Sequence, residues 1–261
     1  MQAEMIDPLY SLSGFVVGAL VGLTGVGGGS LMTPLLILVF GVHPATAVGT
    51  DLLFAACTKS IGVAVHARGN TVDWRITRLL AIGSLPMAAV TIAVLHRLDV
   101  HAAAVSQVIS PVLAIAILTT ALLLVFQKQV LRWAGPYSDR IAPRDLTKLT
   151  IGAGAILGVL VSLSSVGAGA LGVSFLTLLH PRLPMSRVVG SDIAHAVPLT
   201  LLAGAGYWFL GATDWGLLGS LLSGSVPGIV LGSLLAARAP AYAIRGALAA
   251  TLCVVAGKLL F

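Results

Sequence analysis

Charged residues are scarce in this sequence. Only 9% of its 261 residues are Asp, Glu, Lys or Arg, whereas soluble globular domains carry about 25%. So few charges cannot cover the surface of a water-soluble domain. Cysteine is also scarce: Cys57 and Cys253 both lie in apolar stretches, so neither a disulfide framework nor a zinc site is indicated. The six histidines show no metal-ligand spacing, and no metal site is expected.

Nucleotide-binding and protease motifs are missing as well. The stretch GVGGGS (25–30) has Ser30 where a dinucleotide-binding loop needs glycine, and no lysine follows it as a Walker loop requires. Neither G-x-G-D nor G-x-S-G, the motifs of intramembrane proteases, occurs. We therefore expect no enzyme, no catalytic residue and no cofactor. The net charge of +6 is interpreted as membrane topology and not as nucleic-acid binding, because basic residues cluster between apolar stretches.

Long apolar stretches are what the sequence does contain. Hydrophobic residues make up 57% of it, and the mean hydropathy is +1.03. The apolar segments are continuous and not alternating, which favours membrane-spanning helices over a β-barrel. They lie at residues 9–24, 30–42, 46–65, 75–95, 102–126, 149–164, 169–180, 188–210, 216–236 and 241–260. The sequence thus predicts an all-α polytopic membrane protein whose surroundings are the lipid bilayer.

The two halves of the chain repeat each other. A shift of 140 to 141 residues superposes four short motifs in the same order. The pairs are LTGVGGGSL (23–31) with LSSVGAGAL (163–171), VGTD (48–51) with VGSD (189–192), Asp73-Trp74 with Asp214-Trp215, and GSLP (83–86) with GSVP (224–227). Such an order indicates two structural repeats. We predict a first repeat at 1–126, a cytoplasmic linker at 127–148 and a second repeat at 149–261.

Loop charges favour inverted repeats. The 66–78 loop is basic and its counterpart 210–215 is not, whereas the 41–46 loop lacks the basic residues of its counterpart 180–187. Basic loops stay cytoplasmic, so each half should cross the membrane an odd number of times. Each repeat is then a broken-helix hairpin plus three transmembrane helices, and both termini are periplasmic. A parallel arrangement, in which each interrupted pair forms one long broken helix, is the alternative.

The two glycine-rich interruptions are the candidate substrate site. A half-helix that begins near Ser30 would present free backbone N–H groups and the positive end of its dipole. Broken helices of this kind form substrate sites in transporters, although close helix packing without any ligand is the alternative reading. The residues predicted to bind a small anion are Thr24, Gly25, Val26, Gly27, Gly28, Gly29, Ser30, Thr50, Asp51, Lys59, Ser164, Ser165, Gly167, Ala168, Gly169, Ser191, Asp192 and His195.

Four ionisable residues of this set lie inside predicted helices. Asp51 and Asp192 are either helix caps near the membrane surface or part of a proton or substrate site. Lys59 lies about 13 residues into its segment, and three interpretations stay open for it: contact with the substrate, pairing with one of the two aspartates, or snorkelling to the surface. His195 is either a proton relay or a buried, satisfied histidine.

These motifs resemble those of the TauE/SafE family of membrane proteins. The resemblance rests on the duplicated VGGG and VGAG elements, on VGTD after Pro44, and on the paired GSLP and GSVP, and it covers nearly the whole chain. The second copy departs from the first at Ser165 and Ala168. The resemblance implies transport of small anions, including sulfite and organosulfur compounds, across the bacterial inner membrane.

We therefore expect a secondary transporter that exports sulfite or a related organosulfur anion by alternating access. A passive anion channel is the alternative. Nucleic acid is not expected as a partner, and the protein is predicted to be a monomer or a homodimer.

Overall fold

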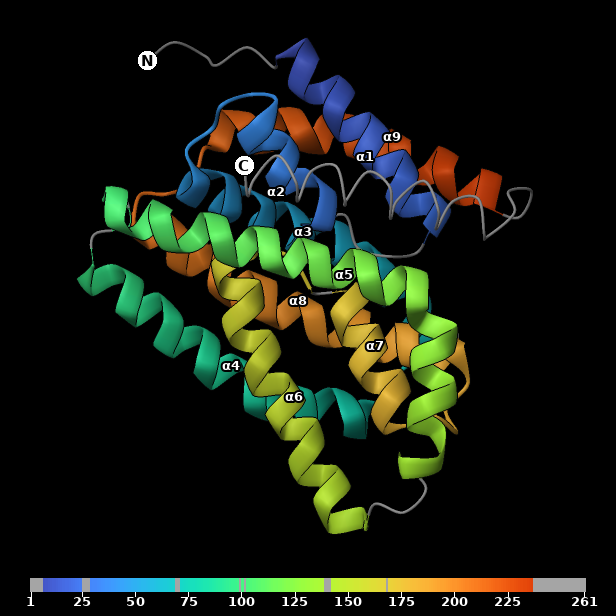
Figure 1. Ribbon diagram of the computed structural model, residues 1–261. Helices are drawn as coiled ribbons and strands as arrows, with labels where there is room; N and C mark the ends of the chain where they lie inside the picture. The colour runs from blue at the N-terminus through green and yellow to red at the C-terminus, as the bar shows by residue number, and fades with distance from the viewer. Residues whose placement is uncertain are drawn as a thin grey trace.

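The structure is entirely helical in the residues that it describes. It is a computed structural model and describes residues 7–24, 29–68, 71–98, 100, 102–138, 142–167 and 169–236. The helices, drawn in Figure 1, are α1 (Pro8–Thr24), α2 (Gly29–Leu38), α3 (Pro44–Arg68), α4 (Trp74–Arg97), α5 (Ala103–Ser138), α6 (Pro143–Ser164), α7 (Ala170–Leu179), α8 (Met185–Phe209) and α9 (Trp215–Ala236). The helical fold class is confirmed, and the predicted segment 241–260 lies outside the described residues.

Several helices have the length and apolar composition of membrane spans. Among the described residues, four stretches can cross a membrane by these criteria. They are Trp74–Arg97, Arg144–Ser164, Met185–Phe209 and Trp215–Gly232. Large apolar side chains such as Val90, Val108 and Phe209 are exposed on the outside of the molecule, as a surface in contact with lipid tails requires.

The chain breaks between helices where the glycine-rich motifs predict. Residues 25–28 separate α1 from α2 and lie outside the described part. Between α6 and α7, Ser165 adopts the left-handed conformation with φ of 57°, and Gly167 and Gly169 have φ of 110° and 142°. Such angles suit glycine, which has no Cβ, so this break is built into the sequence.

The polar stretch 127–148 is helical over most of its length. Helix α5 continues to Ser138, and α6 already begins at Pro143, so most of the stretch predicted as a linker belongs to these two helices. Gln, Lys, Leu and Arg all have high helix propensity, and polar residues continue a helix readily where it leaves the apolar layer. The connection between the halves is therefore short.

Helices α3 and α8, which occupy equivalent places in the two repeats, pack against each other and run in opposite directions. The Thr50 hydroxyl near the start of α3 accepts a hydrogen bond of 3.1 Å from the backbone N–H of Asp214, beyond the end of α8. The repeat-equivalent Ser191 hydroxyl near the start of α8 accepts one of 2.8 Å from the backbone N–H of Asp73, beyond the end of α3. Each half thus makes the same contact with the other half, as expected for two units related by a two-fold axis.

The outer helices pair across the halves in the same reciprocal way. Helix α1 lies along α9, and α4 packs on α6 (Figure 1). A Cβ added to Gly14 would lie 2.2 Å from the Leu221 carbonyl oxygen, and one added to Gly154 would lie 2.3 Å from that of Leu80. These are equivalent pairs, because 14 and 154 differ by 140 and 80 and 221 by 141. Small residues let the backbones approach closely, which is how helices associate in lipid.

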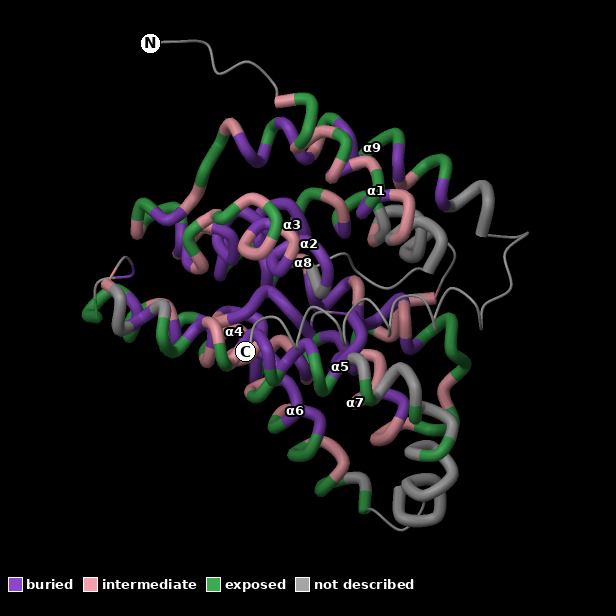
Figure 2. The backbone as a smooth tube through the Cα atoms, turned by 45° about the horizontal axis from the view of Figure 1, so that its top comes forward, coloured by how far each residue is buried: buried purple, intermediate pink, exposed green. Residues whose placement is uncertain are grey.

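The core of the molecule lies along α3 and α8. Figure 2 shows buried residues concentrated on these two helices, whereas α1, α4 and α9 alternate between buried and exposed. Asp51 of α3 and Asp192 of α8 are among the most buried residues. The fold therefore places ionisable side chains at its centre, where two antiparallel helices cross.

The close approach of α4 and α6 predicts different effects for two neighbouring glycines. Gly154→Ala should lower the stability by about 1–3 kcal/mol, because the new methyl group meets the backbone of α4, which cannot move aside cheaply. Gly152→Ala, on the same helix, is the matched control, since a Cβ there has no neighbour within 4 Å. Melting temperatures in detergent measure both. Equal melting temperatures for the two variants would contradict this packing.

Candidate functional site

Four ionisable side chains lie at the crossing of α3 and α8. They are Asp51 and Lys59 on α3, and Asp192 and His195 on α8. Their exposed fractions are 0%, 6%, 1% and 1% respectively. Buried charges at membrane depth are costly and are kept where they pair with one another or serve a function. This cluster is the candidate site.

Asp51 is held by hydrogen bonding from the neighbouring hairpin helix. The Thr33 hydroxyl of α2 donates to Asp51 Oδ2 at 2.5 Å, while Oδ1 has no hydrogen-bond partner among the described residues. Ser165, at the tip between α6 and α7, lies close enough to interact with the carboxylate without a regular hydrogen bond. Asp51 thus links α2 and α3 of the first half to the glycine-rich tip of the second.

Asp192 has a different environment from its repeat counterpart. Neither of its carboxylate oxygens has a hydrogen-bond partner in the part of the chain that the structure describes. Its Oδ1 lies against α7, where a Cβ added to Gly172 would be only 1.7 Å away. The residue that corresponds to Thr33 by the 140-residue shift is Val173, which has no hydroxyl to donate. The two aspartates are therefore equivalent in position but not in bonding.

The expectation that Asp51 and Asp192 cap their helices is wrong. Helix α3 begins at Pro44 and α8 at Met185, so each aspartate lies about two turns inside its helix. A cap must precede the first helical turn to accept its free N–H groups. The prolines at 44 and 184 start these helices earlier than the apolar pattern predicts, because the fixed φ of proline suits a helix start.

Lys59 interacts electrostatically with both aspartates. Asp192 lies on the partner helix α8, and Asp51 lies on the same helix as Lys59. Only 6% of the lysine is exposed, which argues against snorkelling, whereas contact with the substrate and pairing with an aspartate both stay predictions. The repeat counterpart of Lys59 is Thr200, so one cation serves two carboxylates.

His195 lies one turn after Asp192 and bonds to α4. Its Nε2 and the Ser84 hydroxyl are 2.7 Å apart, while Nδ1 has no hydrogen-bond partner among the described residues. Lys59 also interacts electrostatically with this imidazole. Ser84 was missed as a site residue, although its place in the repeated GSLP and GSVP motifs was a usable signal. Thr33 was missed too, and no motif marked it.

Thr50 and Ser191, both predicted to bind the anion, are engaged elsewhere. Their hydroxyls accept hydrogen bonds from the backbone of Asp214 and Asp73 and so hold the ends of α3 and α8 together. Sequence adjacency to the two aspartates suggested a shared role, but successive helical residues point in different directions.

The second glycine-rich tip is buried next to this cluster. Ser164, Ser165, Gly167 and Gly169 are all buried. The Ser164 hydroxyl donates to the Leu160 carbonyl at 2.7 Å and accepts from the Val166 N–H at 3.2 Å, so it stabilises the turn itself. The Ser165 hydroxyl has no hydrogen-bond partner in the described chain and is the better candidate to bind a ligand.

The first tip is described only in part. Thr24 is the last residue of α1, and Gly29 and Ser30 are the first two of α2. Gly25, Val26, Gly27 and Gly28 lie outside the described residues, as does Ala168 of the second tip.

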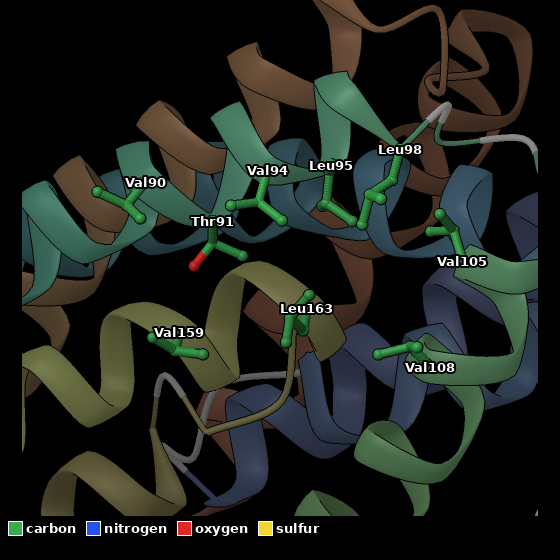
Figure 3. Close-up of a pocket in the computed structure, with 9 residues that line it drawn as sticks. All are labelled: Val90, Thr91, Val94, Leu95, Leu98, Val105, Val108, Val159 and Leu163. Atoms are coloured by element: carbon green, nitrogen blue, oxygen red, sulfur yellow. The ribbon is translucent and has the colours of Figure 1, made fainter.

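A separate cavity of about 390 Å³ opens between α4, α5 and α6. Figure 3 shows the side chains that line it, and among them only Thr91 is polar. The Thr91 hydroxyl donates to the Met87 carbonyl of its own helix at 2.8 Å, and Val90, Val94 and Val108 are about half exposed. This apolar hollow faces outward and does not suit an anion.

Comparison with known proteins bears on what this buried cluster serves. A family model described as "Sulfite exporter TauE/SafE" matches residues 10–259. The chain belongs to the TauE/SafE family. Two relatives from Bacillus subtilis (strain 168) cover nearly the whole chain. "Probable membrane transporter protein YjnA" is 37% identical over 95% of this chain and 98% of its own length. "Probable membrane transporter protein YdhB" is 24% identical over 95% and 97% respectively. No solved structure matches the chain.

Membership in the TauE/SafE family makes the protein a multi-pass membrane transporter, as the apolar helices already indicate. The names of the relatives give a transporter without a substrate. The buried cluster of this TauE/SafE chain is therefore the part of the molecule from which a substrate class must be argued.

The hydrogen bond from Thr33 should stabilise the folded protein. Thr33→Val keeps the shape of the side chain but leaves a buried carboxylate without its donor, which should cost about 1–3 kcal/mol. Thr200→Val is the control, because the hydrogen bonds of the Thr200 hydroxyl go to carbonyls of its own helix, Ala196 at 2.9 Å and Val197 at 3.4 Å. Thermal melting in detergent compares the two. A Thr33→Val protein as stable as the control would show that this hydrogen bond contributes nothing.

Proposed function

We propose that the protein is a secondary transporter of small sulfur-containing anions, with sulfite export as the first candidate activity. The observation that carries the proposal is a buried lysine at the centre of a TauE/SafE fold, between two antiparallel helices. A cation enclosed at this depth interacts strongly with negative charge, because little water screens it, and an anion would compete for it with Asp51 and Asp192. Sulfite enters through the family description alone.

Hydrogen-bond donors beside the lysine support an oxyanion as ligand. The Ser165 hydroxyl has no partner in the described residues and lies near Asp51, which in turn interacts with Lys59. Helix α7 begins five residues later, at Ala170, and the first N–H groups of a helix have no acceptor within it. Backbone N–H groups, hydroxyls and one ammonium together form the kind of site that tetrahedral or pyramidal oxyanions occupy.

The antiparallel course of α3 and α8 supports inverted repeats. These helices are equivalent in the two halves, and their reciprocal hydrogen bonds through Thr50 and Ser191 join the start of each to the end of the other. If both cross the membrane, the halves cross it in opposite directions. A parallel arrangement of repeats would instead make α3 and α8 point the same way. Alternating access then follows from rocking one half against the other around a central site.

The charge distribution supports a cytoplasmic location for the connection between the halves. Most of the described basic residues lie at helix ends on one side of the molecule, the side where Asp73 and Ser191 meet. These are Arg75, Arg78, Arg144, Lys148, Arg182 and Arg187. Basic ends stay in the cytoplasm, so we propose that residues 127–148 lie inside and the N-terminus outside. Arg97 lies at the other end of α4 and is the exception.

The inverted topology predicts opposite labelling of two equivalent tryptophans. Trp74 and Trp215 begin α4 and α9 and are 51% and 53% exposed. In a protein whose own cysteines are replaced by serine, Trp74→Cys should react with a membrane-impermeant maleimide only from the cytoplasmic side, and Trp215→Cys only from the outside. Labelling of both from the same side would rule out inversion.

Anion binding is tested by thermal shift on the purified protein. Sulfite, sulfate, methanesulfonate and acetate are compared, and a ligand that binds the folded state raises the melting temperature. We expect stabilisation by the sulfur oxyanions and its loss in Lys59→Met, which removes the charge but keeps the length. Lys148→Met is the control, because Lys148 is exposed at the start of α6.

Two outcomes would contradict the proposal. No stabilisation by any of the sulfur anions would remove the substrate class, and full stabilisation of Lys59→Met would remove the site. Single-channel currents from the reconstituted protein would show that it works as a passive anion channel and not as a carrier.

A further inference from the structure

We infer that Asp192 takes up a proton when an anion binds at Lys59, so that the transporter carries an anion and a proton together. The inference rests on the proposed function and adds the coupling ion to it. It starts from the difference between two carboxylates that the repeat makes equivalent.

Asp192 depends on Lys59 for the stabilisation of its charge. Its two oxygens have no hydrogen-bond donor among the described residues, and Lys59 is the group whose charge acts on it. A buried carboxylate stays ionised only where hydrogen bonds or an opposite charge replace its lost water. If an anion takes up the interactions of Lys59, Asp192 loses its support and becomes neutral by binding a proton.

Asp51 keeps support that does not come from Lys59. The Thr33 hydroxyl donates to its Oδ2, and Ser165 lies beside it. The position equivalent to Thr33 in the second half holds Val173, so Asp192 has no such donor. We therefore expect the proton on Asp192 when an anion engages Lys59, because Asp51 keeps the Thr33 hydrogen bond and Asp192 has none among the described residues.

Among the described residues, the charged groups of the elements around Asp192 are few. Helix α3 contributes Asp51 and Lys59, and α8 itself contributes His195, whose Nε2 is bonded to Ser84. Helix α7, against which Asp192 lies, has no ionisable residue within Ala170–Leu179. The described basic and acidic residues of α4 and α6 lie in the first two turns or the last turn of these helices, away from the Ser84 level.

The binding step balances in charge and protons. Before binding, the charge of the Lys59 ammonium stabilises the Asp192 carboxylate. Afterwards Lys59 faces the anion, and Asp192 holds one proton taken from the side of the membrane to which the site is open. Release on the other side reverses both events. For a monovalent anion the cargo is then electrically neutral.

Proton uptake on anion binding tests this inference with the full-length purified protein. Methanesulfonate and sulfate are the probes, because their charges do not change between about pH 5 and about pH 8. Their affinity should rise as the pH falls, by up to about tenfold per pH unit. In weak buffer with a pH indicator, binding should consume about one proton per anion.

Three variants assign the proton to its residue. Asp192→Asn should bind the anions with no pH dependence and no proton uptake, whereas Asp51→Asn, the repeat-matched control, should keep both. Val173→Thr gives Asp192 the kind of donor that Asp51 has, and it should move the rise in affinity to lower pH. This nearly isosteric variant keeps the test decisive if Asp192→Asn does not fold.

The outcomes separate this inference from the proposed function. If neither methanesulfonate, sulfate nor sulfite binds at any pH, the proposed function fails, and the inference fails with it. If an anion binds but consumes no proton, or if Asp192→Asn retains both proton uptake and pH dependence, the inference alone is overturned. Loss of the pH dependence in Asp51→Asn but not in Asp192→Asn would assign the proton to Asp51 instead of Asp192. This result would overturn the inference as well.

Discussion

A lysine ammonium enclosed between two membrane helices has to be balanced by negative charge. Lys59, Asp51 and Asp192 are all buried where α3 packs against α8, and the charges of both aspartates act on the lysine. Removing either side of such a pairing leaves a buried charge uncompensated, which is strongly destabilising. The surrounding fold can be understood as what is needed to hold one cation and two carboxylates away from water.

Close backbone contact gives this centre its rigidity. The glycines at 14, 18, 154 and 158 bring the outer helix pairs so near that an added Cβ would lie within 2.6 Å of a carbonyl oxygen. Because the contacts of the α1 and α9 pair recur between α4 and α6, the two sides of the molecule are built alike. The two halves differ at central positions of the candidate site, where Lys59 corresponds to Thr200 and Thr33 to Val173.

Most of the fold, but only part of the candidate site, can be predicted from the sequence. Apolar segment lengths and the 140-residue repeat predict the helices and their breaks, because both are local or periodic properties. The pairing of Thr33 with Asp51 and of Ser84 with His195 depends on which helix faces which, and no spacing in the chain encodes it. Thr50 and Ser191 were assigned to the anion site because they precede the aspartates. Their hydroxyls bond to Asp214 and Asp73 instead, since a helix turns about 100° between neighbours.

Coupling an anion to a proton changes the driving force for transport. A monovalent anion that leaves a cell alone gains about 2.3 kcal/mol per 100 mV from an interior-negative potential. An anion that leaves with a proton gains nothing from the potential, and an inward proton gradient opposes it. Net efflux then requires an outward anion gradient that exceeds the inward proton gradient. The carrier would thus release accumulated anion and would not pump the anion out against its gradient. A pair of carboxylates that differ by one hydroxyl donor would thus set the energetics of the whole protein.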